Sequence, residues 1–346
     1  MHIIREQENI ELSGKELVSI SIVNWNGGED IKKCLESLRR QSYKNIEVIV
    51  VDNHSTDGSL EFLKSDSHSI KLIENKDNMG FSKAHNQAIK IYKGEYILIL
   101  NFDIILSSNF VEEMLKAANL FNDIGMVSGK LYKKFEYNIS DILDTTGITM
   151  NNMYPSDRGE NTLDSGQFAK HEFVFGASGA APLYKRKMLE DVKVGDEYFD
   201  EDFFIYVEDV DLAWRAQLYG WRCIYTPEAI AYHERGATRR DDERIRKGYY
   251  TIGYRNRYLA IFKNSLISNI LKHLPKILIR ETWFYLSHLY QKNFYVLKVP
   301  FLSLKLLPIM VKKRREVQNK RKVSKAYMEK FFFSPSFFKK KQKKCR

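Results

Sequence analysis

The sequence has few cysteines, and their placement argues against two kinds of stabilised fold. Cys34, Cys223 and Cys345 are odd in number, far apart and without a CxxC spacing. We therefore expect neither a disulfide framework nor a zinc site, and we interpret the thiols as reduced and structural. The first sixteen residues lack an apolar stretch behind a positively charged one, so no signal peptide is expected.

Long apolar runs are also missing. The best window, residues 294–311, is interrupted by Lys298, Pro300, Lys305 and Pro308. A membrane-spanning helix needs roughly 20 predominantly apolar residues, so we expect no transmembrane segment.

Acidic residues are scarce in the last third of the chain. Residues 238–346 hold 29 of the 55 Lys and Arg residues but only 6 of the 44 Asp and Glu residues, so the net charge of +11 arises there. Large apolar residues alternate with basic clusters in this region, as where 294–311 precedes 312–315 and 331–338 precedes 339–341. This pattern suits an anionic membrane surface better than a nucleic acid.

We therefore expect residues 263–346 to form a basic, amphipathic, helical extension on the inner face of the cell membrane. The protein would be cytoplasmic and peripheral, with no nucleic acid partner. The alternative is that residues 263–330 fold as ordinary helices packed on the rest of the chain.

The N-terminal part alternates strand and helix signals. Runs rich in β-branched residues at 17–23, 46–52, 69–75 and 96–101 are separated by amphipathic patterns at 29–41, 59–64 and 81–93. Continuous apolar strands separated by amphipathic helices are typical of a buried parallel sheet built from βαβ units. With 346 residues, 44% of them hydrophobic, the chain can form one large core plus an appendage.

Polar loops follow all four of these strands, reading NWNGGED, DNHSTDGS, NKDNMG and FD. Open α/β sheets bind ligands beyond the carboxyl ends of their strands, so we expect these loops to line one crevice. Residues 125–206 are rich in glycine, serine and aromatic residues, which predicts irregular, substrate-facing structure. An aromatic strand over 203–207 should then lead into a helix that ends near Gly220, its C-cap.

Two strand ends carry candidate ligands for a nucleotide. Asn101 and Asp103 flank Phe102, so strand alternation sends both oxygen-bearing side chains to one side. They could hold Mg²⁺ or Mn²⁺ against a diphosphate, or they could simply cap the strand. Asp52 could likewise pair with a base or a ribose, or belong to an ordinary βα turn.

Several motifs of the sequence together resemble those of a known family. Residues 18–59, NMGF (78–81), ILNFD (99–103) and VEDVDLAWR (207–215) occur in the order found in family 2 glycosyltransferases, particularly the rhamnosyltransferase-like branch. The resemblance covers about residues 17–240. It implies an α/β class fold of the GT-A nucleotide-diphospho-sugar transferase type, a Rossmann-like mixed sheet flanked by helices.

The resemblance also implies the roles of nucleotide-side residues. The base would be walled by Val23, Asn24 and Trp25, the base or ribose contacted by Asp52, and the pocket shaped by Asn78, Gly80 and Asn101. Asp103 would be the metal-facing acid, with His233 reaching the metal or the diphosphate. Asn101 stands where the usual DxD motif has its first aspartate, which would weaken metal binding.

On the acceptor side, the resemblance implies that Asp209, in the pair Glu208–Asp209, is the general base that takes the proton of a sugar hydroxyl. Repulsion within the pair would raise one carboxyl pKa, although a negative helix N-terminus is the structural alternative. The neighbouring arginines Arg235, Arg239 and Arg240 could meet phosphate charge. The small residues Gly176, Ala177, Ser178 and Gly179 would admit a bulky acceptor, unless they form only a tight turn.

We therefore expect an inverting glycosyltransferase that uses a divalent metal. It would move rhamnose or another hexose from a nucleoside diphosphate sugar to a saccharide or polyprenyl-linked acceptor, in cell-surface polysaccharide or glycoprotein glycan synthesis. After a leader (1–16), a catalytic domain (17–262) would comprise a nucleotide-binding half (17–124) and an acceptor-binding half (125–262). The alternatives are a catalytically inactive relative and a nucleotidyltransferase, for which the expected basic glycine-rich loop is missing.

Overall fold

The computed structural model describes residue 12 and residues 15–66, 69–135, 138–235 and 243–332. The first part of the chain has the expected βαβ alternation, with element ends within two residues of those expected from the sequence. Its elements are β1 (Val18–Asn24), α1 (Gly28–Arg39), β2 (Ile46–Asp52), α2 (Ser59–Ser65), β3 (Lys71–Glu74), α3 (Gly80–Ile91) and β4 (Tyr96–Asn101).

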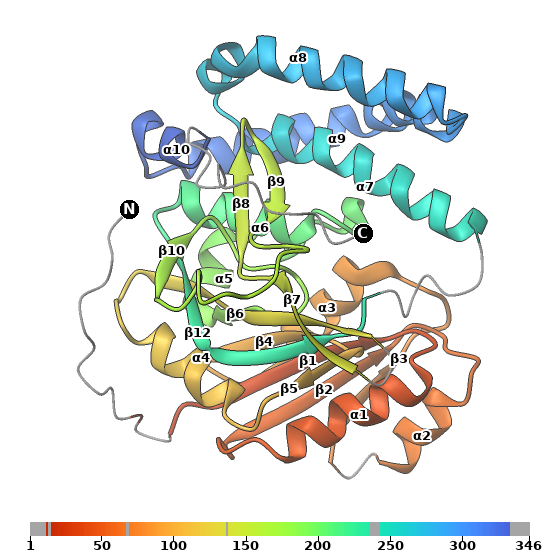
Figure 1. Cartoon of the computed structure of the whole chain (residues 1–346), viewed down its shortest axis with the longest axis vertical. Coiled ribbons are helices and arrows are strands. Elements are labelled where there is room, and N and C mark those ends of the chain that lie inside the picture. Colours follow the sequence, from red (N-terminus) through yellow and green to blue (C-terminus); the bar gives the residue numbers. More distant parts are fainter. Residues whose placement is uncertain (1–11, 13–14, 67–68, 136–137, 236–242, 333–346) are drawn as a thin grey trace.

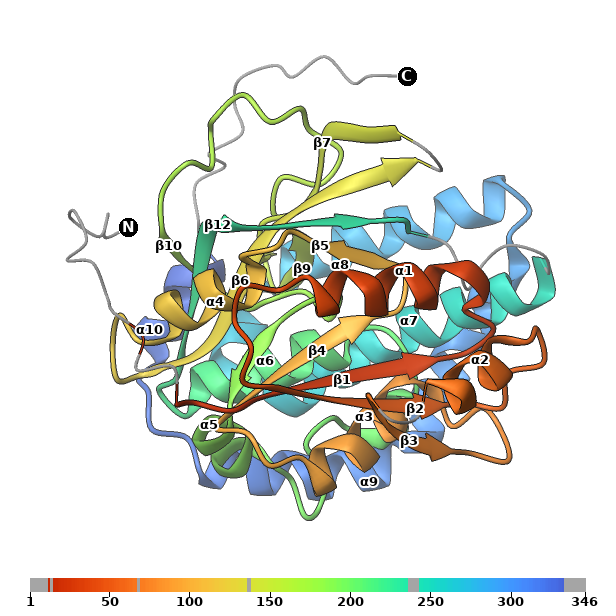
Figure 2. The ribbon, with the colours of Figure 1, turned by 90° about the horizontal axis from the view of Figure 1, so that it is seen from below.

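The second part of the chain completes a mixed sheet. Its elements are β5 (Ile104–Leu106), α4 (Phe110–Ala118), β6 (Ile124–Phe135), β7 (Asn138–Thr145), β8 (Ile148–Asn151), β9 (Tyr154–Asp157), β10 (Glu172–Val174), β11 (Leu183–Lys185), α5 (Arg186–Val192), η1 (Glu201–Phe203), α6 (Glu208–Leu218) and β12 (Arg222–His233). The strand order is β10-β12-β6-β11-β4-β1-β2-β3, with β5 paired to β12 and β7 to β6. Figure 2 shows β3, β2, β1 and β4 lying next to one another.

The expectation of irregular structure over 125–206 is wrong for much of that region. β6 and β12 each run for 12 residues and pair in parallel, although about 90 residues separate them along the chain. Glycine at position 129 permits this pairing, because a Cβ there would lie 2.6 Å from the carbonyl oxygen of Ala229. This glycine therefore serves close strand packing and is not a sign of irregular structure.

The sheet is covered on both faces. In β4, Ile97 and Ile99 belong to one hydrophobic core, whereas Leu98 and Leu100 belong to the other. The first core includes buried side chains of α3, α5 and α6, and the second includes those of α1 and α4. Because neighbouring strand residues point to opposite faces, an uninterrupted apolar run is required when helices cover both.

The structure describes two of the three cysteines. Cys34 and Cys223 are free and buried, and burial raises the pKa of both thiols. Cys345 lies outside the described residues.

The last part of the chain is a helical layer on the α6 side of the sheet, remote from α1 and α2 (Figure 1). It comprises α7 (Glu243–Asn264), α8 (Ile267–Tyr290), η3 (Phe294–Lys298), α9 (Val299–Asn319) and α10 (Lys325–Phe332). The boundary expected near residue 262 falls within α7.

A buried cluster of charges joins this layer to the sheet domain. The Nζ atom of Lys263, on α7, lies 2.5 Å from a carboxylate oxygen of Asp200 and 2.7 Å from one of Asp211, on α6. Lys313, on α9, approaches Asp200 at 2.6 Å, and Arg215 pairs with Asp211 at 2.9 Å. Although burial opposes ionisation, the two ammonium groups hold the pKa of Asp200 well below its usual range. Part of the extension therefore packs on the rest of the chain, as the alternative interpretation allowed.

By length and composition alone, one helix among the described residues could cross a membrane, contrary to the expectation from the sequence. It comprises η3 and α9, Phe294–Asn319, and 17% of its apolar window is buried. The interrupting lysines and prolines are too few to disqualify it on those criteria. However, Met310, Lys313 and Val317 are buried against the rest of the protein, so the second half of this helix has protein neighbours.

We predict that Lys263→Met lowers the free energy of unfolding by about 3–5 kcal/mol, because Asp200 and Asp211 lose a buried partner. Urea unfolding of the full chain measures this change. The matched control, Lys320→Met, removes an exposed ion pair with Glu316 and should cost less than about 1 kcal/mol. Equal losses in the two variants would contradict a special role for the buried cluster.

Candidate functional site

A cavity of about 270 Å³ opens at the carboxyl ends of β1 and β4, where the strand-end loops were expected to converge. The sequence-predicted residues that line it are Val23, Trp25, Asn78, Gly80, Asn101, Asp103, Ser178, Gly179, Glu208, Asp209, His233 and Arg235. The structure thus brings together residues from widely separated parts of the chain.

Asn78 and Gly80 form one wall. The side-chain oxygen of Asn78 accepts hydrogen bonds from the Gly80 amide at 2.9 Å and from the Asn53 side chain at 3.3 Å. Gly80 has a φ of +77°, and a Cβ there would lie 2.5 Å from the Phe204 ring. Glycine is therefore required both for the backbone conformation and for the approach of Phe204.

Two predicted nucleotide contacts lie off the cavity lining. Asn24 and Asp52 are fully buried and occupy paired positions at the ends of β1 and β2. The amide of Asn24 donates to a carboxylate oxygen of Asp52 at 2.7 Å and to the hydroxyl of Ser55 at 2.9 Å. In this arrangement they tie the two strand ends together, and ligand contact by Asp52 stays a prediction.

A chain of charged side chains forms another part of the cavity lining. The Nε2 atom of His233 lies 3.3 Å from Asp103, and its Nδ1 atom lies 2.8 Å from Asp144. Burial opposes protonation of this imidazole, but the carboxylates of Asp103 and Asp144 outweigh it and raise the pKa of His233 to about 9. With Nδ1 directed at the buried Asp144, Nε2 faces Asp103 and the cavity.

Arg235 extends this chain. Its guanidinium lies 2.5 Å from Asp144 and 2.8 Å from Asp157, a residue of β9 that also lines the cavity. These carboxylates raise the pKa of Arg235, against the effect of burial, so its charge is held near the site. Arg239 and Arg240, also expected to meet phosphate charge, lie outside the described residues.

The carboxylate pair lies in the first turn of α6. The two oxygens of Asp209 accept hydrogen bonds from the backbone amides of Gly179 and Val210, each at 2.7 Å. Removal from water raises the pKa of Asp209 to about 6, and the amide of Gly179 partly offsets the increase. Burial and the neighbouring Asp209 raise the pKa of Glu208. Asp209 is thus ionised at neutral pH yet basic enough to accept a proton.

The small-residue segment divides between two roles. Ser178 and Gly179 line the cavity, whereas Gly176 and Ala177 do not. A Cβ on Gly176 would lie 2.4 Å from the Cβ of Ala213 on α6, so this glycine permits close packing of the segment on the helix. Acceptor contact by Gly176 and Ala177 stays a prediction.

The aromatic strand expected over 203–207 is absent from the structure, and its place is taken by η1 and a tight turn. Phe204, Tyr206 and Val207 have φ values of 64°, 68° and 72°. Such values are unusual for bulky residues and are outliers for a β-branched residue such as Val207. The turn places residues 204–207 in the cavity lining immediately before Glu208.

Asn53, Phe102 and Ala180 line the cavity within segments expected to reach it, whereas no site role was predicted for Phe81, Asp157, the turn residues 204–207 and Tyr249. Phe81 and Phe102 lie beside predicted residues, so the motifs could have indicated them. Asp157 and Tyr249 belong to none of the sequence motifs. Their elements, β9 and α7, are brought to the cavity by the tertiary fold. The Tyr249 ring lies 6.3 Å from Trp25 and 6.4 Å from Phe204, centroid to centroid.

The chain is similar to several known proteins in sequence and in fold. A family model described as "Glycosyl transferase family 2" matches residues 19–193. The glycosyltransferase GlyG of Streptococcus pneumoniae is 33% identical over 34% of this chain, and the match spans 40% of that relative. An N-acetylglucosaminyl-diphospho-decaprenol L-rhamnosyltransferase of Mycobacterium tuberculosis is 23% identical over 65% of this chain and 79% of its own length.

Two solved structures share the fold. The mannosyltransferase PcManGT of Pyrobaculum calidifontis, in complex with GDP-Man and Mn²⁺, matches with a TM-score of 0.51 and 15% identity over 94% of this chain and 86% of that one. GalNAc-T7 with UDP, GalNAc and Mn²⁺ matches with a TM-score of 0.55 and 13% identity over 72% and 48% of the two chains. Both confirm the expected mixed α/β sheet flanked by helices.

Proposed function

Because this chain belongs to glycosyl transferase family 2, we propose that it is an inverting glycosyltransferase whose general base is Asp209. It moves a sugar from a nucleoside diphosphate sugar to a saccharide or polyprenyl-linked acceptor. The observation that carries the proposal is that Asp209 lines the same cavity as Asp103 and His233. One wall can therefore hold the diphosphate while the other removes a proton.

The proposed step is a single displacement. The carboxylate of Asp209 takes the proton of an acceptor hydroxyl while that oxygen attacks the anomeric carbon. The bond from this carbon to the diphosphate oxygen breaks, and the nucleoside diphosphate leaves with its electron pair. The amides of Gly179 and Val210 orient the carboxylate, and Arg235 supplies positive charge near the diphosphate.

A divalent cation is the proposed cofactor. Asp103 offers an oxygen ligand, and His233, 3.3 Å away, would offer a nitrogen ligand once the cation displaced the proton from Nε2. No group of three or more His, Cys, Asp or Glu residues in the described part of the chain could hold a metal alone. This fits an ion completed by the donor's phosphate oxygens. When bound, such an ion neutralises charge on the leaving diphosphate. The Mn²⁺ in both structural neighbours supports this proposal.

For the sugar, we propose rhamnose or another hexose. The support is the mycobacterial relative, a rhamnosyltransferase acting on a decaprenol-linked sugar. The same relative supports a lipid-linked acceptor, and a polysaccharide synthase among the relatives of this chain supports a role in polysaccharide synthesis. An inactive relative is the alternative that a donor screen addresses directly.

A donor screen with an Asp209→Asn variant tests the proposed function. Purified full-length protein with Mg²⁺ or Mn²⁺ is incubated with nucleoside diphosphate sugars, including a dTDP-linked deoxysugar, and scored by nucleoside diphosphate release and by protection from thermal unfolding. We expect Asp209→Asn to lower turnover by about 10²–10⁴-fold while donor protection persists. The wild-type rate should rise with pH through about 6, because Asp209 must be deprotonated to act.

As a control, Asp66→Asn removes a carboxylate paired with Arg39 away from the cavity, and its turnover should match that of the wild type. If no donor is turned over but one protects, the inactive relative is the better description. Undiminished turnover in Asp209→Asn would assign the base elsewhere.

Metal binding has its own prediction. Asp103→Asn should weaken Mn²⁺ binding by at least about tenfold, because the ion loses its only carboxylate ligand in the proposed pair. Calorimetric titration with Mn²⁺, with and without the donor nucleotide, measures this affinity. Asp123→Asn, which lies in a surface ion pair with Arg222, serves as the control. Unchanged Mn²⁺ affinity, together with turnover that survives EDTA, would remove the metal from the proposal.

We also propose that the protein lies on an anionic membrane through its helical layer. Eight large apolar side chains of α8 are exposed, in two runs with a spacing of three or four residues: Ile267, Leu271, Leu274 and Leu278, then Ile279, Trp283, Leu286 and Tyr290. On a helix this spacing forms a stripe, which here shifts around the helix between Leu278 and Ile279, and in a water-soluble protein such a stripe would face the core. Phe301 and Leu304, in the first half of α9, are also exposed. Because Lys313 pairs with Asp200, we place α9 on the membrane surface and not across it.

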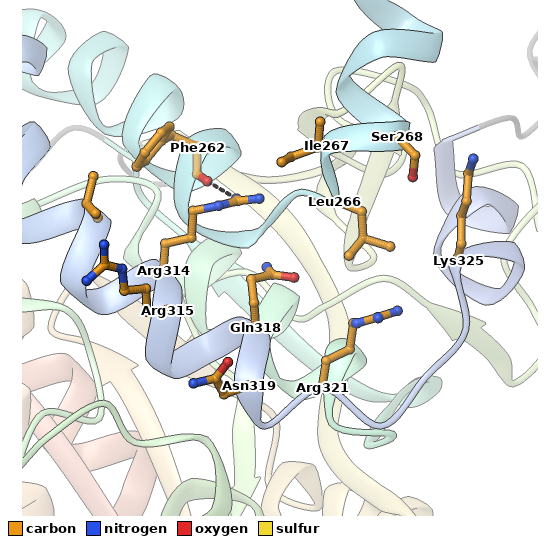
Figure 3. Close-up of a pocket in the computed structure, with 11 residues that line it drawn as sticks. Phe262, Leu266, Ile267, Ser268, Arg314, Arg315, Gln318, Asn319, Arg321 and Lys325 are labelled. Carbon is orange, nitrogen blue, oxygen red and sulfur yellow. Dashed lines mark hydrogen bonds between the residues drawn. The ribbon is translucent and has the colours of Figure 1, made fainter.

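A basic groove lies at one end of this stripe. It has a volume of about 630 Å³ and lies between the start of α8 and the end of α9. Figure 3 shows Leu266 and Ile267 on one side, with Arg314, Arg321 and Lys325 around the opening. The described residues that line it include no acidic residue. Apolar and cationic groups side by side suit lipid chains and their phosphates.

Vesicle sedimentation tests the membrane proposal. We expect the double variant Ile279→Glu, Trp283→Glu to lose at least about tenfold in binding to vesicles containing phosphatidylglycerol, because charge replaces the exposed apolar contacts. Leu163→Glu, at a side chain that is 61% exposed and bridged to Ile142 of β7, should bind like the wild type. Equal binding by the double variant would overturn the surface, and equal binding to neutral vesicles would overturn its anionic character.

A further inference from the structure

The turn Phe204–Val207 contacts both halves of the site. On its nucleotide side, the carbonyl oxygen of Phe204 accepts hydrogen bonds from the amides of Phe81 and Ser82, at 2.7 and 3.2 Å, where α3 begins. On its other side, the turn runs directly into Glu208 and Asp209. Its conformation therefore determines where the carboxylate of Asp209 lies relative to the donor wall.

This conformation is not one that its residues adopt by themselves. Phe204, Tyr206 and Val207 are bulky residues with positive φ values, and such conformations persist only where surrounding contacts impose them. The contacts that hold the turn must therefore be found outside it.

Asn256 provides these contacts. It lies on α7 and is fully buried, and its side-chain amide donates to the carbonyl oxygens of Phe203, Ile205 and Tyr206 at 2.7, 2.9 and 2.8 Å. Its own side-chain oxygen accepts a hydrogen bond from Arg255 at 2.7 Å, and Arg255 donates to the carbonyl oxygen of Asp202 at 2.6 Å. One amide group thus contacts three backbone carbonyls of the turn, of which that of Phe203 also accepts from the Ile205 amide at 2.7 Å.

The helix that carries Asn256 is fixed at a second point. Two turns further along α7, Lys263 and Asn264 contact Asp211 of α6 at 2.7 and 2.8 Å. About one turn before Asn256, a Cβ on Gly253 would lie 3.3 Å from the Tyr206 ring. α7 is therefore in register with both the turn and α6.

We propose that Asn256 is a positioning residue of the glycosyl-transfer reaction. By holding the carbonyls of the turn it sets the position of Asp209 against the Gly179 amide and keeps the donor wall at Phe81 attached to the same turn. Asn256 does not line the cavity, so it acts through the turn and not on the substrate. This role rests on the proposed function of Asp209.

Hydrogen exchange of backbone amides tests the positioning without requiring a substrate. The amides of Phe81 and Ser82 report on the turn, because they donate to Phe204, and the amide of Gly179 reports on Asp209, because it donates to that carboxylate. We expect Asn256→Ala to lower protection at these three amides by at least about tenfold, with protection in β1 and β2 unchanged. The control is Thr251→Val, which removes a hydroxyl that donates to the Lys247 carbonyl within α7. This variant should change the protection of none of the three amides.

Kinetics test the consequence for the reaction. With the donor identified by the screen, Asn256→Ala should lower kcat by about 10–100-fold, since small displacements of a base are costly, while donor KM changes by less than about threefold. The acid limb of the pH profile should move down by about one unit, because a released Asp209 regains water. Thr251→Val should leave kcat and the acid limb in place.

A second variant covers the case in which Asn256→Ala does not fold. Val207→Gly removes a bulky residue from a left-handed position, so the turn needs less support. In the Val207→Gly background the Asn256→Ala change should lower protection at the Gly179 amide by less than the tenfold loss expected for Asn256→Ala in the wild-type background. Unchanged protection at Phe81, Ser82 and Gly179 in a folded Asn256→Ala protein would overturn the proposal. By contrast, absence of turnover in the wild type would refute the proposed function while leaving the exchange result interpretable.

Discussion

The pairing of buried charges between the helical layer and α6 is the constraint on which the site depends. The buried carboxylate of Asp200 lies between the ammonium groups of Lys263 and Lys313, which hold its pKa well below its usual range, and Lys263 also pairs with the buried Asp211. Their pairing requires α7 and α9 to lie at one position on the sheet domain. With α7 in that position, Tyr249 lines the cavity and Asn256 holds the turn that lines it, so the helical layer takes part in forming the site.

The two parts of the site are held in place in different ways. The donor wall stands on buried parallel strands, whose ends are tied by the hydrogen bond between Asn24 and Asp52. The proposed general base, Asp209, follows the turn 204–207, whose backbone conformation is unfavourable for its residues. A reaction that joins two substrates needs both walls at a fixed separation, and the contacts from α7 to the turn provide it.

The helical layer also has two different faces. Its inner face carries Lys263, Lys313 and Met310, which are buried, whereas its outer face carries Ile279, Trp283 and Phe301, which are exposed. The two interpretations of the extension that the sequence left open, packing on the protein and contact with lipid, therefore need not exclude each other. A helix layer of this kind would hold the cavity at a constant height above a membrane.

What the sequence alone determined is local. The apolar runs of β1, β2 and β4 and the periodicity of α1 and α3 predicted the parallel sheet, because strand and helix repeats are set by backbone geometry. The motif residues Asp103, Asp209 and His233 were predicted by resemblance, and the fold places all three in one cavity. The sequence did not reveal the pairing of β6 with β12, the left-handed turn at 204–207, or Asn256 and Asp157 near the site. These depend on contacts between segments far apart in the chain, where tertiary packing overrides local preference, and only the folded structure decides them.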